Sequence, residues 1–173
     1  FSDFDVIVDG FTYRCHKHLL NATSGYFQSV FRSGMKESIE NRLELKLMSR
    51  DIFEVIGRAL YTGVSGLTKD NIQDIWPATQ LLQIKHLSDE CEHFALQHVD
   101  NGNCVEMYYF AKSIFSPNVA NRANNFMIFG FEAMIKTEAF LQLMTPDVFA
   151  DLLENRHLNV SSEDVAVNSI LKW

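Results

Sequence analysis

Short alternating runs of apolar and polar residues open the chain. Residues 5–8 (Asp-Val-Ile-Val) and 11–15 (Phe-Thr-Tyr-Arg-Cys) each have the pattern of a β-strand. The pair Asp9-Gly10 between them is a strong signal for a two-residue turn, so the pattern predicts a β-hairpin. Residues 42–47 alternate leucines with charged residues, which predicts a further strand with Leu47 on its buried face.

Two short helical patterns, residues 18–24 and 26–31, lie between the hairpin and the last of these strands. We expect them to form separate helices because Gly25 can adopt the left-handed conformation that ends a helix. Residues 35–37 follow, and the pattern predicts a loop there.

Apolar residues then recur every three or four positions, which predicts amphipathic helices. The first helix covers residues 51–61. The second begins at Thr68, and we expect Pro77 to divide it in two, because proline removes a hydrogen-bond donor and clashes one turn back. The third covers residues 89–99, with Ser88 as its N-cap.

The strand patterns vanish beyond residues 100–102 (Asp-Asn-Gly), which read as a hinge. Helical patterns alone follow, and they cover residues 103–114, 118–135, 146–153 and 163–173, two of them introduced by Ser116-Pro117 and Thr145-Pro146. The chain therefore has the pattern of an α+β domain over residues 1–100 and an all-α domain over residues 101–173.

Composition and charge exclude several classes of protein. Hydrophobic residues make up 47% of the 173 residues and charged residues 21%, which is typical of a globular chain. The net charge of -7 argues against binding nucleic acid, since residues 14–18 form the largest basic cluster and are too few to neutralise a phosphate backbone. No apolar run approaches the length of a membrane span, and no signal peptide opens the chain.

The cysteine count points to a reducing compartment. The chain has three cysteines, at positions 15, 91 and 104, and an odd number cannot all pair in disulfides. We expect a cytoplasmic protein, with the nucleus also compatible. The missing initiator Met and the end at Trp173 suggest a fragment of a longer chain.

Three groups of residues resemble catalytic or metal sites. Cys91, His98 and Cys104 could supply zinc ligands, although His93 projects from another face of the predicted helix. Cys15 and His16 are neighbours in a strand and therefore point to opposite faces, which is unsuited to a nucleophile and its base. Residues 63–66 (Gly-Val-Ser-Gly) read as a turn, because no long strand precedes them and the second glycine comes one residue too early for a nucleophile elbow.

The order of short motifs along the chain resembles the BTB (POZ) domain, with greatest similarity to BTB–BACK proteins of the Kelch-like type. The motifs that carry the resemblance are Val6-Ile7-Val8-Asp9-Gly10, Tyr13-Arg14-Cys15-His16-Lys17, Ser24-Gly25-Tyr26-Phe27, Gly34-Met35-Lys36-Glu37-Ser38, Tyr61-Thr62-Gly63, Trp76-Pro77-Ala78-Thr79, Phe140-Leu141-Gln142-Leu143 and Leu158-Asn159-Val160. Together they cover nearly the whole chain.

The resemblance implies a non-catalytic adaptor that forms a homodimer and binds the N-terminal domain of cullin-3 in a RING ubiquitin ligase. Catalysis would belong to the partners, no cofactor is implied, and regions outside this chain would bind the protein substrate. The family's charged pair matches Asp3 and Lys17, and the dimer interface that it implies comprises Phe1, Asp3, Lys17, Leu19 and Leu20. The family's hydrophobic-x-Glu motif matches Met35 and Glu37, and the cullin-binding residues that it implies are Phe31, Met35, Lys36, Glu37 and Tyr61.

Two departures from the family pattern are visible. The family's N-terminal helix and first strand, which often swap between protomers, lie upstream of Phe1. Residues 113–127 are richer in Asn than the helix pair that forms the family's groove for the cullin N-terminal extension, matched here by residues 103–131.

Three functions compete on this evidence. The first is the cullin-3 adaptor. The second is an oligomerising scaffold or transcription-associated factor that does not bind cullin. The third is a small metal-dependent enzyme that uses the region of Cys91, His98 and Cys104.

Overall fold

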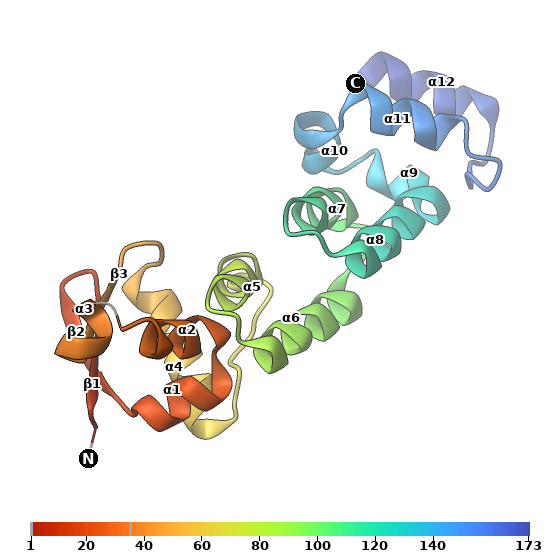
Figure 1. Cartoon of the computed structure of the whole chain (residues 1–173). Helices are drawn as coiled ribbons and strands as arrows, with labels where there is room; N and C mark the ends of the chain where they lie inside the picture. The colour runs from red at the N-terminus through yellow and green to blue at the C-terminus, as the bar shows by residue number, and fades with distance from the viewer. Residues whose placement is uncertain (1, 35) are drawn as a thin grey trace. The chain divides into compact units, whose positions relative to one another are not determined.

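The computed structural model describes residues 2–34 and 36–173 (Figure 1). The chain divides into two compact units, Phe1–Phe94 and Ala95–Trp173. The first unit contains a mixed β-sheet and helices, and the described part of the second contains helices without strands. The predicted α+β class is confirmed.

The sheet of the first unit has the strand order β2-β1-β3. Strands β1 (Phe4–Val8) and β2 (Phe11–Cys15) form the predicted antiparallel hairpin. Asp9 and Gly10 have φ angles of 50° and 79°, so both adopt the left-handed conformation that suits a two-residue hairpin turn. Strand β3 (Arg42–Leu45) pairs with β1 in parallel.

Helices fill the rest of the first unit. They are α1 (Lys17–Thr23), α2 (Gly25–Arg32), α3 (Lys36–Glu40), α4 (Arg50–Thr62), α5 (Ile72–Leu81) and the start of α6 (Lys85–His98). Their buried side chains pack with the central strand into one core, whose largest members are Phe4, Phe27, Ile56, Ile75, Trp76, Leu82, Ile84 and Leu87.

The break between α1 and α2 has a different cause from the predicted one. Ser24 is extended and serves as the N-cap of α2, where its Oγ accepts a hydrogen bond from the backbone N–H of Phe27 at 3.2 Å. Gly25 is the first residue of α2 and has no left-handed backbone. A Cβ on Gly25 would lie 2.6 Å from Oε1 of Gln83, so close approach, rather than helix termination, explains the glycine.

The segment around residue 36 is also different from its prediction. Lys36 and Glu37 form the first turn of the short helix α3 and do not lie in a loop, while Met35 lies outside the described residues. Strand β3 ends at Leu45, and Leu47 is 78% exposed, so the predicted burial of Leu47 is wrong. The alternation stops because the backbone leaves the sheet two residues earlier.

Pro77 does not divide its helix. Helix α5 runs continuously through it, and the carbonyl one turn back belongs to the exposed Gln73, where water can replace the missing partner. Helix α6 begins at Lys85, so Ser88 lies inside it and is not its cap. The Ser88 hydroxyl instead accepts a hydrogen bond from Nε1 of the buried Trp76 at 3.2 Å.

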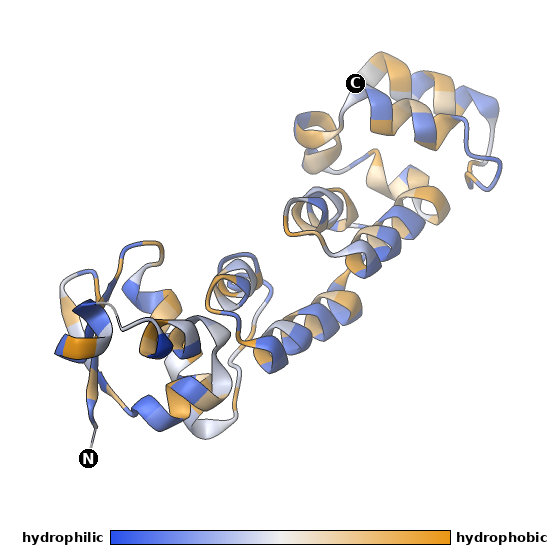
Figure 2. Cartoon of the chain, viewed as in Figure 1, coloured by the Kyte–Doolittle hydropathy of each residue, from blue (hydrophilic) through white to orange (hydrophobic). Residues whose placement is uncertain are grey.

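The second unit is helical along its described residues. Its helices are α7 (Cys104–Ser113), α8 (Pro117–Phe129), α9 (Phe131–Met134), α10 (Glu138–Leu143), α11 (Pro146–Leu153) and α12 (Glu163–Lys172). Pro117 and Pro146 begin their helices as predicted. The predicted helix over residues 118–135 is interrupted at Gly130, and α10 is an addition to the predicted set. The exposed side of α8 is polar, as Figure 2 shows, and carries Asn121 and Arg122.

A substitution at Gly130 tests how closely the second unit is packed at this turn. A Cβ there would overlap Oδ1 of Asn101 and would lie 2.9 Å from the Phe126 carbonyl oxygen. We expect Gly130→Ala to lower the free energy of unfolding by about 1–3 kcal/mol, as overpacking does. Chemical denaturation measures the change.

The double variant Gly130→Ala/Asn101→Ala is the control for this prediction. It removes the nearer obstacle and should recover part of the lost stability, because the two positions are in contact and their effects do not add. An unchanged stability in Gly130→Ala would contradict the close packing of this turn.

Candidate functional site

Helices α2 and α3 carry three of the residues that the sequence assigned to cullin binding. Phe31 is half-buried and packs edge-on against Phe4, with ring centroids 4.9 Å apart. The Phe31 carbonyl accepts a hydrogen bond from the Ser38 hydroxyl at 3.1 Å, which ties α2 to α3. Lys36 is exposed and pairs with Glu40 at 3.6 Å. Met35, the fourth of these residues, lies outside the described residues.

Glu37 lies on α3, which packs against α2. Burial raises the pKa of Tyr26 on α2, and the negative charge of Glu37 raises it further. Tyr26 also lines a groove of about 250 Å³ together with Leu47 and Leu81. Leu47 is 78% exposed and Leu81 is 39% exposed. We call Tyr26, Glu37, Leu47 and Leu81 the α3 patch.

Three members of the α3 patch were not predicted from the sequence. Leu47 was assigned to a buried face, and Tyr26 and Leu81 were given no functional role. The sequence did contain a signal that Leu47 could be exposed. Leu47 lies directly before Met48, and two adjacent side chains in an extended segment point to opposite faces, so only one of them can enter the core. The structure buries Met48 and exposes Leu47.

Asp3 and Lys17 are each satisfied within the chain. Asp3 Oδ1 accepts a hydrogen bond from the backbone N–H of Lys17 at 2.7 Å, and it thereby caps the start of α1. The Lys17 ammonium donates to Oδ1 of Asn41 and lies 5.8 and 5.7 Å from the ring centroids of Phe4 and Phe31. The carboxylate of Asp3 therefore bonds to the backbone of Lys17, and the ammonium has other partners.

Leu19 and Leu20, which the resemblance assigns to a dimer interface, differ in how far their side chains are exposed to solvent. Leu19 is half-buried, whereas Leu20 is 2% exposed and belongs to the core. Leu19 is thus the better placed of the two to contact another chain. Phe1 lies outside the described residues.

Tyr61, assigned to cullin binding, lies near the Asp3 end of the unit. Its hydroxyl accepts a hydrogen bond from the backbone N–H of His16 at 3.1 Å and bonds the His16 ring at 2.9 Å. Burial is the main cause of the raised pKa of Tyr61, and the charge of Asp3 contributes. The structure therefore ties Tyr61 to His16, and its assignment to cullin binding stays a prediction.

The candidate catalytic and metal groups are structural in character. Cys15, Cys91 and Cys104 are buried free thiols, and burial raises their pKa values to about 11, 12 and 11. Because the thiolate is the nucleophile and the metal ligand, these groups are in the unreactive form at neutral pH. No cluster of three or more potential metal ligands occurs among residues 2–34 and 36–173.

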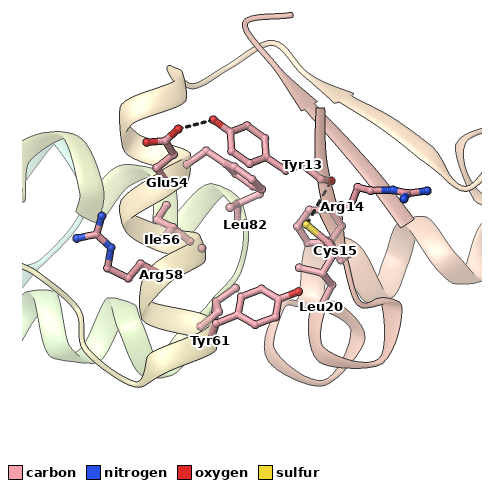
Figure 3. Close-up of a pocket in the computed structure, with 13 residues that line it drawn as sticks. Tyr13, Arg14, Cys15, Leu20, Glu54, Ile56, Arg58, Tyr61 and Leu82 are labelled. Carbon is pink, nitrogen blue, oxygen red and sulfur yellow. Dashed lines mark hydrogen bonds between the residues drawn. The ribbon is translucent and has the colours of Figure 1, made fainter. Parts of the chain in front are cut away.

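A polar junction joins the hairpin to α4 (Figure 3). The Tyr13 hydroxyl donates a hydrogen bond to Glu54 Oε1 at 2.8 Å, and Arg50 Nε donates to the same oxygen at 2.7 Å. The Arg50 guanidinium also lies 4.1 Å from the ring centroid of Phe11, at the tip of the hairpin. The two donors hold the pKa of Glu54 below its usual value.

Two family models match this chain. The BTB/POZ domain model matches residues 1–99, which is more than half of the chain. The chain belongs to the BTB/POZ family. A second model, described as BTB And C-terminal Kelch (BACK), matches residues 104–173 of this BTB protein.

Named relatives support the assignment. The chain is 30% identical to human Kelch-like protein 23 over 164 residues, which are 95% of the chain and 29% of that protein. It is 29% identical to human Kelch repeat and BTB domain-containing protein 8 over 172 residues, which are 98% of the chain and 28% of that protein. The chain therefore spans less than a third of the length of these relatives.

The fold has a solved counterpart. The BTB domain of zebrafish PATZ1 is 25% identical and superposes with a TM-score of 0.50 over 56% of this chain and 76% of that one. Neither matched family model is an enzyme family, and the BTB and BACK families are protein-interaction modules. In the described part of this BTB–BACK chain, the helices are too short or too polar to cross a bilayer.

The junction at Glu54 predicts a pH dependence of stability. Because the folded-state pKa of Glu54 lies below its usual 4.5, the carboxylate stabilises the fold above that pH and loses its contribution as the pH falls through the folded-state value. We expect Glu54→Gln to be less stable than wild type at pH 7 and the difference to shrink steadily on acidification. Urea unfolding at a series of pH values measures it.

The variant Glu90→Gln is the control, since Glu90 is an exposed residue on α6. Its stability difference from wild type should stay small across the same pH range. A Glu54→Gln difference that grows on acidification would contradict the assigned direction of the shift.

Proposed function

We propose that this BTB–BACK chain is a non-catalytic adaptor that binds the N-terminal domain of cullin-3 through the α3 patch and pairs with a second copy through the face of α1. The observation that carries the proposal is the α3 patch itself. It combines exposed leucines with a carboxylate at the start of a helix, on a chain whose family is one of protein-interaction modules.

The chemistry of the α3 patch suits a protein partner. Leu47 and Leu81 present apolar side chains around a groove of about 250 Å³, and their burial would supply the apolar centre of an interface. Glu37, in the first turn of α3, can accept hydrogen bonds from backbone N–H groups of the partner. Met35, which the family motif pairs with Glu37, adds a second apolar contact in this proposal.

The face of α1 suits a copy of the same chain. Asp3 fixes the start of α1 through the 2.7 Å bond to Lys17, so the helix presents Leu19 in a defined orientation. The Lys17 ammonium is held over the Phe4 and Phe31 rings, which keeps a positive charge close to an apolar surface. In this proposal the protein substrate is bound by regions outside the chain, and ubiquitin transfer is carried out by the partners.

Reversal of the charge of Glu37 tests the cullin interface. We expect Glu37→Lys to weaken binding to a cullin-3 N-terminal domain by about 2 kcal/mol or more, as for a residue near the centre of an interface. The carboxylate acceptor is lost, and a lysine is placed beside the leucines. Isothermal titration calorimetry with the purified 173-residue chain measures the change.

The matched control is Glu90→Lys, which makes the same charge change at an exposed position of α6. It should bind as wild type does, and both variants should retain the wild-type circular dichroism spectrum. Equal affinity in Glu37→Lys and wild type would remove Glu37 from the interface. Absence of cullin binding in wild type would favour an oligomerising scaffold without a ligase role.

The self-association face has its own test. We expect the wild-type chain to have twice its chain mass of 19.9 kDa and Leu19→Asp to have the chain mass alone, because a charge would be placed in an apolar contact. Light scattering with size-exclusion chromatography measures both. Leu141→Asp, the same change at an exposed position of α10, is the control and should keep the wild-type mass. A monomeric wild type would contradict the pairing.

A further inference from the structure

A cavity of about 220 Å³ lies between β2 and α4, inside the first unit (Figure 3). Its lining is mostly apolar and comes from five parts of the fold: Tyr13 and Cys15 of β2, Leu20 of α1, Phe27 of α2, Phe53, Ile56, Gly57 and Leu60 of α4, and Leu82 after α5. The space is partly open to solvent, so a small molecule can enter it. A dry apolar cavity of about 150 Å³ is large enough to bind benzene.

Gly57 lies in the middle of α4, where glycine is unfavourable. Its backbone does not require glycine, since Gly57 has no positive φ. Close packing does not require it either, because a Cβ at this position would meet no atom within 4 Å. Gly57 does line the cavity, so its lack of a side chain enlarges the space between α4 and the hairpin.

The polar groups at the cavity are already paired with one another. The Tyr13 hydroxyl is bonded to Glu54, and the Tyr61 hydroxyl is bonded to His16. The guanidinium groups of Arg14 and Arg58 point away from the space between β2 and α4 in Figure 3. A charged ligand would therefore find no free counter-charge inside, and a neutral one would lose no hydrogen bonds.

Aromatic rings form much of the wall. Tyr13 and Phe53 lie with their ring centroids 5.0 Å apart, and Phe27 and Tyr61 complete the set. Rings of this kind favour edge-to-face contacts with another aromatic group. The Cys15 thiol, protonated at neutral pH because burial raises its pKa to about 11, adds a polarisable apolar surface.

We propose that the cavity between β2 and α4 is a binding site for a small neutral aromatic molecule, between benzene and indole in size. The size follows from the cavity volume, and the absence of charge follows from the paired polar groups. The pocket shares Leu82 with the groove of the α3 patch, but the proposal does not depend on cullin binding.

Titration of the ¹⁵N-labelled chain with indole, followed by NMR, tests the proposal. We expect saturable shifts of the amides of Cys15, Phe53 and Leu60 with a dissociation constant below about 1 mM, which is within reach of a ligand of this size. Benzoate, a charged aromatic molecule, should cause no saturable shift. Gly57→Leu should lower the affinity for indole at least tenfold, because the added side chain enters the cavity.

The variant Ala22→Leu is the matched control, since it adds a leucine to an exposed site of α1 outside the lining. It should bind indole as wild type does. Gly57→Ala is the second variant in case Gly57→Leu does not fold, and it should weaken indole binding severalfold while raising the melting temperature. No saturable shift in wild type, or equal indole affinity in wild type and in the folded Gly57 variant, would overturn the proposal.

Discussion

The central strand β1 is the constraint on which the first unit depends. Phe4, Val6 and Val8 are at most 2% exposed, and the strand is paired on both sides. Its pairing with β2 is antiparallel and needs only a two-residue turn, but its pairing with β3 is parallel and needs a long crossover. That crossover contains α1, α2 and α3. The burial of one strand therefore requires the connection that carries Lys17, Phe31 and Glu37.

Lys17 connects the two proposed interaction surfaces. Its backbone N–H is bonded to Asp3 at the start of α1, while its ammonium lies over Phe31 at the end of α2. A change in the position of α1 would therefore move a charge that contacts the helix leading to α3. Because the Lys17 ammonium contacts the Phe31 ring, substitutions at Lys17 and Phe31 should not be additive in their effects on stability.

Local signals in the sequence predicted much of the fold. Asp9-Gly10 determined the hairpin because both residues tolerate a positive φ, and Pro117 and Pro146 marked helix starts because proline has no N–H to satisfy there. Long-range packing decided the rest. The approach of Gln83 explains Gly25, and the burial of Trp76 in the core keeps α5 continuous through Pro77.

The candidate site could be predicted only in part, for the same reason. The family motif identified Glu37, which local sequence can specify. The groove that completes the α3 patch needed Tyr26, Leu47 and Leu81, which come from three separate segments and meet only through the fold. Tyr61 was assigned to that site by resemblance, and its contacts with His16 became visible only in three dimensions.

The shifted pKa values of this chain have two different causes, hydrogen bonds to a carboxylate and burial of a thiol or phenol. The shift of Glu54 comes from donors on its own helix and on the hairpin, and it therefore reports a bond that holds the fold together. The shifts of the cysteines come mainly from burial. The raised pKa of Tyr26 also comes mainly from burial, and the negative charge of Glu37 adds to it. Because the Tyr26 phenol is uncharged at neutral pH, the Glu37 carboxylate meets no like charge there, and in the proposed interface it can accept hydrogen bonds from a partner's backbone N–H groups.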